Sequence, residues 1–155
     1  MTATDGGGPA PRVPVDQATR DLVSRDGLGR TLFVEAGAGT GKTTQLVDRI
    51  ANLVLHEGIR LVNIAAITFT EAAAAELQAR IRVKFEQGAA ASEGDERQRC
   101  LDALADADLA AISTLHGFAS RLLNEYAVEA GLPPRLTVLD EVSSQLAHEL
   151  SLIHI

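Results

Sequence analysis

The run Ala36-Gly37-Ala38-Gly39-Thr40-Gly41-Lys42-Thr43 is the stretch of this sequence that decides the fold. It fits the phosphate-loop pattern G-x-x-x-x-G-K-[ST], with Ala36 in place of the first glycine. Small side chains let backbone N–H groups point at an anion, while Lys42 can reach the β- and γ-phosphates and the Thr43 hydroxyl can bind Mg²⁺. The run, with Thr44 beside it, predicts a site for a nucleoside triphosphate and Mg²⁺. The alternative is a glycine-rich turn that happens to precede a lysine.

The segments on either side of the glycines match what a phosphate loop requires. Thr31–Glu35 (TLFVE) is short, apolar and rich in strand-forming residues, which predicts a buried strand. After the loop, apolar residues recur at the spacing of one helical face, at Leu46, Val47, Ile50, Leu53 and Val54. Upstream, Asp16 is expected to cap a short helix that runs through Ser24. Strand, loop and helix therefore follow one another in the order that the motif needs.

A second strand and helix are predicted downstream of the first helix. Ile64–Phe69 (IAAITF) indicates a strand, and Thr70 is expected to cap the helix that follows it. The buried face of that helix is predicted from the spacing of Ala74, Leu77, Ile81 and Phe85. A loop is expected over Gln87–Asp95.

A third unit completes the predicted architecture. After a short helix around Arg97–Leu104, Leu109–Ser113 predicts another strand. The next helix should bury a stripe of Phe118, Leu122 and Tyr126 and should end near Gly131. Strands that alternate with helices imply parallel crossovers, so the expected fold is a three-layer α/β sheet.

Composition limits the class of protein. The 155 residues are 46% hydrophobic and 23% charged, as in an ordinary soluble domain. No apolar run approaches the ~18 residues that a membrane span needs, and the single cysteine, Cys100, excludes a disulfide framework or a multi-cysteine zinc site. Residues 1–14 are expected to form a flexible leader without signal-peptide features. We therefore expect a cytoplasmic protein with no membrane partner.

Four ordered blocks resemble one enzyme family. VEAGAGTGKTT (Val34–Thr44), ITFTEAAAAELQARI (Ile67–Ile81), ISTLHGFASRLL (Ile112–Leu123) and LPPRLTVLDE (Leu132–Glu141) resemble the N-terminal motor domain of bacterial superfamily 1 DNA helicases of the UvrD/RecB type. Ala72, where the UvrD branch has lysine, is similar to the RecB/AddA helicase–nuclease side. The resemblance implies an incomplete P-loop NTPase (RecA-like) parallel sheet flanked by helices, which binds ATP and Mg²⁺ and acts on single- or double-stranded DNA in DNA repair.

The resemblance also implies roles for particular residues. The second block contacts single-stranded DNA in this family and the third block faces it, so the implied DNA-binding residues are Thr68, Phe69, Thr70, Thr114, His116 and Gly117. An aromatic face such as that of Phe69 stacks on any base without reading it. Gln17 corresponds to the adenine-reading glutamine that the family carries ahead of its phosphate loop, and a solvent-facing helix residue is the alternative. The net charge of −7 argues against a dedicated nucleic-acid binder.

The end of the chain carries its own expectations. Leu136–Glu141 looks like the acidic strand that holds Mg²⁺ in other P-loop proteins, but in the resembled family this stretch precedes an inserted helical subdomain, so Asp140 is expected to be a helix cap. We expect a partial motor domain over residues 15–140, the start of the helical subdomain over 141–150, and a non-native tail over 151–155. The family's later acidic motif, arginines and second motor domain are missing, so a fragment with negligible ATP turnover is expected.

Two other functions stay open from the sequence. A self-contained small P-loop kinase or NTPase would need Leu139–Glu141 as its magnesium-binding motif and an arginine late in the chain, where Arg121 and Arg135 are available. A non-enzymatic binding module could keep the loop as an anion site. The helicase hypothesis adds, as possible partners, the other subunits of a helicase–nuclease complex.

Overall fold

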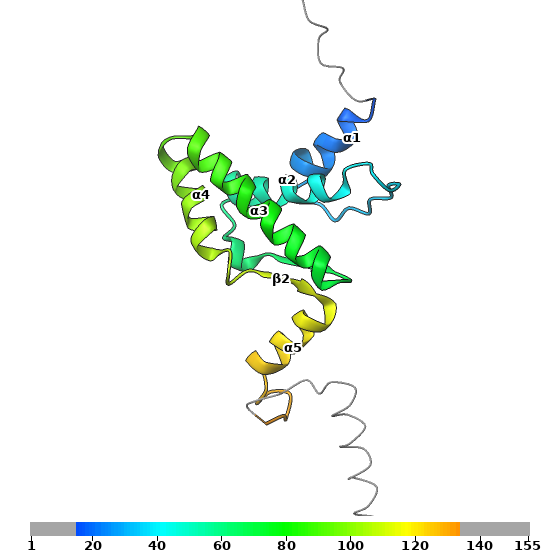
Figure 1. The fold of residues 1–155 in the computed structure, drawn as a ribbon, viewed down its shortest axis with the longest axis vertical. Coiled ribbons are helices and arrows are strands. Elements are labelled where there is room, and N and C mark those ends of the chain that lie inside the picture. The colour runs from blue at the N-terminus through cyan, green and yellow to red at the C-terminus, as the bar shows by residue number, and fades with distance from the viewer. Residues whose placement is uncertain (1–14, 134–155) are drawn as a thin grey trace, which may run out of the picture.

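The computed structural model describes residues 15–133 (Figure 1). Two short helical turns, four longer helices and two strands follow one another along the described chain. In order they are α1 (Gln17–Asp21), the π-helical turn η1 (Leu22–Asp26), α2 (Lys42–Leu55), the 3₁₀ turn η2 (Leu61–Asn63), β1 (Ala65–Thr68), α3 (Glu71–Ala91), α4 (Gly94–Asp106), β2 (Ala111–Thr114) and α5 (Leu115–Glu125). None of the described helices is both long enough and apolar enough to cross a membrane.

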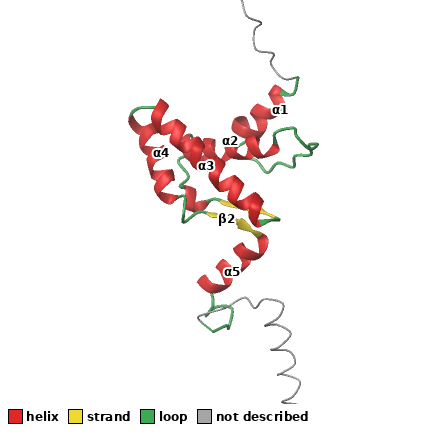
Figure 2. Ribbon diagram, in the orientation of Figure 1, coloured by secondary structure: helices red, strands yellow, loops and turns green. Residues whose placement is uncertain are grey.

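The two described strands form a parallel pair. Ala65 of β1 aligns with Ala111 of β2, and Thr68 aligns with Thr114 at the other end of the ladder. Parallel neighbours need a crossover connection, which α3 and α4 supply (Figure 2). The α/β class and the strands predicted at Ile64–Phe69 and Leu109–Ser113 are therefore confirmed, with bounds shifted by one or two residues.

The core of the described chain lies among α2, α3 and α4, on one side of the strands (Figure 1). The predicted helical stripes are buried there: Val47, Ile50 and Val54 on α2, and Ala74, Leu77, Ile81 and Phe85 on α3. Cys100 of α4 is fully buried against them, and burial, with the nearby Glu96 carboxylate, raises the pKa of its thiol. Cys100 therefore serves as a small apolar packing residue.

The predicted loop over residues 87–95 is wrong in its first half. α3 continues through Ala91 because alanines favour a helix and Ala89 is buried against the core. Gly88 does not break the helix, since it lies where α4 approaches most closely: a Cβ on Gly88 would stand 2.8 Å from Sγ of Cys100. α4 also begins earlier than predicted, at Gly94. The demand for close helix packing outweighs the low helix propensity of this glycine.

The prediction of a buried strand at Thr31–Glu35 is wrong. This segment is extended but has no strand partner among residues 15–133, and the side chain of Phe33 is 94% exposed. Apolar, β-branched residues favour an extended backbone, whereas a strand also needs a neighbour for its N–H and C=O groups. Without it, the expected three-layer sheet is reduced in the described residues to two strands beside helices.

The prediction of a buried stripe on the last helix is also wrong. No residue of α5 is buried, and Leu122 and Tyr126, the latter just after the helix, are 41% and 52% exposed. Figure 1 shows α5 leaving the sheet by its first turn and projecting away from the helical core. The helix ends at Glu125, earlier than predicted, and Gly131 lies in the following turns with φ of +67°.

The two predicted helix caps differ in outcome. The hydroxyl of Thr70 accepts a hydrogen bond from the Ala73 amide at 3.2 Å, which confirms this cap. Asp16 precedes α1 but makes no capping bond, because its carboxylate accepts from Nε of Arg20 instead. The expectations for residues 1–14, Leu136–Glu141, Asp140, 141–150 and 151–155 lie outside the described residues.

Candidate functional site

The glycine-rich run forms a closed loop that leads into α2. Gly39 and Gly41 have φ of +76° and +87°, which side-chain-bearing residues rarely adopt. The Thr40 hydroxyl donates to the Gly37 carbonyl at 2.8 Å and holds the turn. The N-terminus of α2 has no side-chain cap, so its first amides are available to an anion.

Lys42 reaches back across this loop. Its Nζ donates to the carbonyls of Ala36 and Gly37 at 2.6 and 2.7 Å, and the side chain is exposed. The ammonium therefore stands over the loop in the position where a negative ligand would meet it. Thr43 and Thr44 follow in the first turn of α2, both exposed. Among the described residues, no group of three or more His, Cys, Asp or Glu side chains comes together to bind a metal ion.

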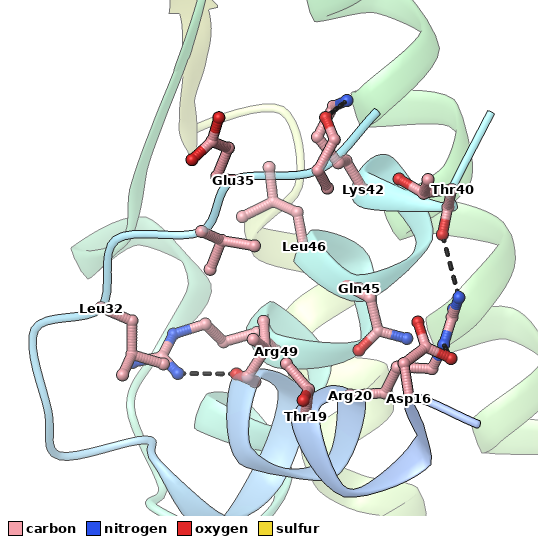
Figure 3. Close-up of a pocket in the computed structure, with 13 residues that line it drawn as sticks. Asp16, Thr19, Arg20, Leu32, Glu35, Thr40, Lys42, Gln45, Leu46 and Arg49 are labelled. Atoms are coloured by element: carbon pink, nitrogen blue, oxygen red, sulfur yellow. Dashed lines mark hydrogen bonds and ion pairs between the residues drawn. The ribbon is translucent and has the colours of Figure 1, made fainter. Parts of the chain in front are cut away.

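A cavity of about 410 Å³ begins at the loop and extends between α1 and α2 (Figure 3). Thr40 and Lys42 lie at the loop end, and Arg49 lies toward the other end. The lining comes from three segments: Asp16, Thr19, Arg20 and Val23; Leu32, Val34, Glu35, Ala36 and Thr40; and Lys42, Gln45, Leu46 and Arg49. A ligand with phosphates on the loop could thus place a second group in this cavity. Thr44 faces elsewhere, lining a cavity of about 380 Å³ between α2 and α3.

Gln17 and Gln45 occupy different places relative to the cavity. Nε2 of Gln17 donates to Oδ1 of Asp21 at 2.7 Å, and Gln17 does not line the cavity. Gln45, one turn beyond Lys42, does line it (Figure 3). Its Oε1 is buried and has no hydrogen-bond partner among the described residues. The sequence analysis missed Gln45; a polar residue beside the apolar stripe of α2 was the available signal.

Two arginines attach the loop and its helix to α1 and η1. Arg20 donates from Nε to Asp16 at 3.0 Å and from Nη2 to the Thr40 carbonyl at 3.1 Å, and its hydrogen bond lowers the pKa of the Asp16 carboxyl. Arg49 donates to the carbonyls of four residues, Val23, Gly27, Leu28 and Arg30, at 2.7 to 3.1 Å. These contacts position one wall of the cavity, and the sequence pattern did not indicate them.

A second group of predicted residues meets at the carboxyl edge of the parallel strands. Because Thr68 and Thr114 are register partners, the segments after them emerge side by side. Phe69 follows β1 with 98% of its side chain exposed, and His116 and Gly117 lie exposed in the first turn of α5. The structure therefore brings together the two sets that were predicted separately.

The threonines of this edge are engaged in internal hydrogen bonds. Thr68 donates to the Thr70 carbonyl at 3.0 Å. Thr114, whose side chain is buried, accepts from the Gly117 amide at 3.1 Å and donates to Glu71 at 2.9 Å. Phe69 and His116 are then the exposed groups at the centre of the edge, and Glu71 is a further residue that the sequence analysis missed.

Comparison with known proteins gives one consistent family. The model of the UvrD/REP helicase N-terminal domain matches residues 16–153. Large subunits of bacterial ATP-dependent helicase/nucleases are similar: 40% identity over 124 residues in Levilactobacillus brevis, 38% over 117 in Desulforamulus reducens and 34% over 114 in Ligilactobacillus salivarius. These alignments cover 78%, 74% and 73% of this chain and 10%, 9% and 9% of the respective relatives. The chain thus spans about a tenth of their length, and it belongs to the UvrD/REP helicase N-terminal domain family.

Proposed function

We propose that this chain supplies the ATP-binding part of the first motor domain of a DNA helicase, with the core of a P-loop NTPase (RecA-like) fold. The observation that carries the proposal is the glycine loop that closes onto the N-terminus of α2 beneath Lys42. Membership of a helicase family supports this function over a small kinase or a non-enzymatic binding module.

The loop residues fit the phosphates of ATP. Phosphate oxygens would replace the Ala36 and Gly37 carbonyls as acceptors of the Lys42 ammonium, a charge-assisted exchange that favours the anion. The backbone amides of Ala36–Thr44 surround the same position, and the positive end of α2 adds to the attraction.

Thr43 is the residue that fits Mg²⁺ here. Its hydroxyl stands in the first turn of α2, and magnesium in nucleotide sites keeps most of its ligands as phosphate oxygens and water. When bound, the ion neutralises charge on the β- and γ-phosphates. One oxygen donor from this part of the chain is consistent with that role.

The nucleotide base would lie in the cavity beyond the loop. There the unpartnered Oε1 of Gln45 offers an acceptor to the exocyclic amino group of adenine. Gln17, which the family resemblance favours, would first have to give up its bond to Asp21. We therefore propose Gln45 as a reader of the base and keep Gln17 as the alternative.

Single-stranded DNA would cross the carboxyl edge of the strands. Phe69 presents a free aromatic face for stacking, and His116 stands beside it at the start of α5. The bonds of Thr68, Thr70 and Thr114 hold the two segments in place. We propose that ATP binding and hydrolysis in the complete protein move DNA across this edge.

The proposal extends to the setting of the protein. The relatives are described as subunits of ATP-dependent helicase/nucleases, so we propose a bacterial, cytoplasmic protein of DNA repair whose partners are the other subunits of a helicase–nuclease. Residues 15–140 would then be the partial motor domain, and 141–150 would begin an inserted helical subdomain.

Replacing Lys42 tests nucleotide binding. In the 155-residue chain, Lys42→Ala should weaken MgATP binding about ten- to hundredfold, measured by titration calorimetry, because a charge-assisted bond to phosphate is lost. The matched control is Lys84→Ala, since Lys84 is the other lysine and pairs with Asp48 on the surface. An affinity of Lys42→Ala within about twofold of wild type would refute the phosphate-loop assignment.

Replacing Phe69 tests the DNA edge. Phe69→Ala should weaken binding of a fluorescent oligo-dT about tenfold, because one base loses its stacking partner. Phe33→Ala is the matched control: Phe33 is 94% exposed against 98% for Phe69, but it lies away from the strand edge. Equal losses in the two variants would refute a specific DNA-binding role for the edge.

A further inference from the structure

A hydrogen-bonded link joins the two segments at the carboxyl edge of the strands. Oγ1 of Thr114 donates to Oε1 of Glu71 at 2.9 Å, and the same oxygen accepts from the Gly117 amide at 3.1 Å. Glu71 is the first residue of α3, whereas Thr114 ends β2 and caps α5. Residues 43 positions apart in the sequence are therefore in direct contact.

The direction of this link follows from the chemistry of a hydroxyl group. A threonine hydroxyl has one hydrogen and two lone pairs. Donation to the Glu71 carboxylate uses the hydrogen and leaves a lone pair for the Gly117 amide. Because Thr114 is only 6% exposed, water has little access to replace either partner. Glu71 thus orients the hydroxyl that caps α5.

The other side of the link is also held. The first turn of α3 is capped by Thr70, and Thr68 donates to the Thr70 carbonyl, so Phe69 lies between two engaged residues. Glu71 then connects this turn to the turn that carries His116. The space around Gly117 is narrow, since a Cβ there would stand 3.3 Å from Oγ1 of Thr114. The two turns are joined at short range.

A carboxylate is an unexpected group on a surface that meets phosphates, since it repels them. The link to Thr114 gives a reason for its presence. We propose that Glu71 is a positioning residue that sets the His116 turn against Phe69, so that both meet one strand of DNA. This inference rests on the proposed DNA-binding function.

Four single substitutions separate the hydrogen bond from the charge. Glu71→Gln keeps an acceptor without the charge, whereas Glu71→Ala removes the acceptor. Thr114→Ser keeps the hydroxyl and Thr114→Val removes it at nearly the same size. Glu76→Ala is the control, because Glu76 is another α3 glutamate on the surface, paired with Arg80.

Two measurements on the 155-residue chain test the proposal: the affinity for a fluorescent oligo-dT, and hydrogen–deuterium exchange of the Gly117 amide without DNA. Glu71→Ala and Thr114→Val should each weaken DNA binding about fivefold and speed the exchange of Gly117, since one hydrogen bond is lost. Glu71→Gln, Thr114→Ser and Glu76→Ala should stay within about twofold of wild type in affinity.

Different results would overturn the proposal in distinguishable ways. Unchanged or tighter DNA binding by Glu71→Ala would mean that the carboxylate is only a surface charge. Weaker binding with unchanged Gly117 exchange would mean that Glu71 touches DNA itself. Failure of the wild-type chain to bind oligo-dT, with Gly117 still exchanging faster in Glu71→Ala, would instead overturn the DNA-binding function and the role of Glu71 in it.

Discussion

The helical core and the two candidate sites use the same kinds of residue in opposite ways. In the core, Phe85 is 1% exposed, whereas Phe33 near the phosphate loop and Phe69 at the strand edge are 94% and 98% exposed. Each of the three stands in a stretch whose local pattern favours regular structure. The difference shows that burial is decided by which elements pack together, and that the apolar groups without a partner gather beside the sites.

Polar contacts differ between the regions as well. Around the core, Arg60 makes two hydrogen bonds to the buried carboxylate of Asp106, which ties the start of η2 to the end of α4. Around the phosphate loop, the arginines bond mainly to backbone carbonyls. Such bonds fix the course of segments that lack a strand ladder.

The largest effect is expected from emptying the core. Phe85→Ala should lower the free energy of unfolding by about 3–5 kcal/mol, because the side chain is fully buried and leaves a cavity. Phe33→Ala should change it by less than about 0.5 kcal/mol. Urea denaturation followed by circular dichroism measures both. Similar losses in the two variants would erase the contrast between the regions.

The next effect concerns the cavity beside the loop. Gln45→Leu should weaken ATP binding about tenfold and reduce the preference for ATP over GTP, because the acceptor for the adenine amino group is lost. Gln17→Leu is the comparison, and its loss should be smaller because Gln17 bonds to Asp21. Titration calorimetry with both nucleotides decides the matter, and a larger loss in Gln17→Leu would assign the base to Gln17.

A smaller effect tests the closest helix contact. Gly88→Ala should destabilise the chain by about 1 kcal/mol, since the new methyl meets Sγ of Cys100 and the gain in helix propensity offsets only part of the cost. With Cys100→Ala as background, the same change should instead stabilise by about 0.5–1 kcal/mol. Thermal unfolding of the four proteins gives the cycle, and an unchanged sign would rule out this contact as the reason for glycine.

The smallest effect is the pH dependence at Asp16. Its pKa is lower in the folded chain than the usual 3.8, so it contributes stability above that pH and loses it as the pH falls through the folded value. The pair is exposed, so the contribution is small. Asp16→Asn should be slightly less stable than wild type near neutral pH and equal to it in acid, with Asp26→Asn as control. A difference that persists in strong acid would contradict this origin.

Much of the core could be predicted from local pattern. The stripe Ala74, Leu77, Ile81 and Phe85, the Thr70 cap and the two strands agree with the structure, because each depends on periodicity or on a nearby backbone bond. The phosphate loop was identifiable for the same reason: its residues are contiguous. Its predicted role in binding stays a prediction.

The errors arise where distant segments decide the outcome. Thr31–Glu35 has strand-forming residues but no partner in the described chain, and α5 has an apolar stripe without a covering surface. Gly88 remains in a helix because of Cys100. The roles of Arg20, Gln45 and Glu71 depend on contacts across 20 or more residues or on burial in a cavity.

By itself, the sequence determined the phosphate loop, the order of helices and strands after it, and the family to which the chain belongs. These properties follow from residues that are neighbours or lie one helical turn apart. Only the tertiary structure decided which apolar stretches are buried, that Gln45 rather than Gln17 lines the cavity, and that Glu71 meets Thr114. Burial and long-range hydrogen bonds depend on pairs of segments, which the local pattern of either one does not encode.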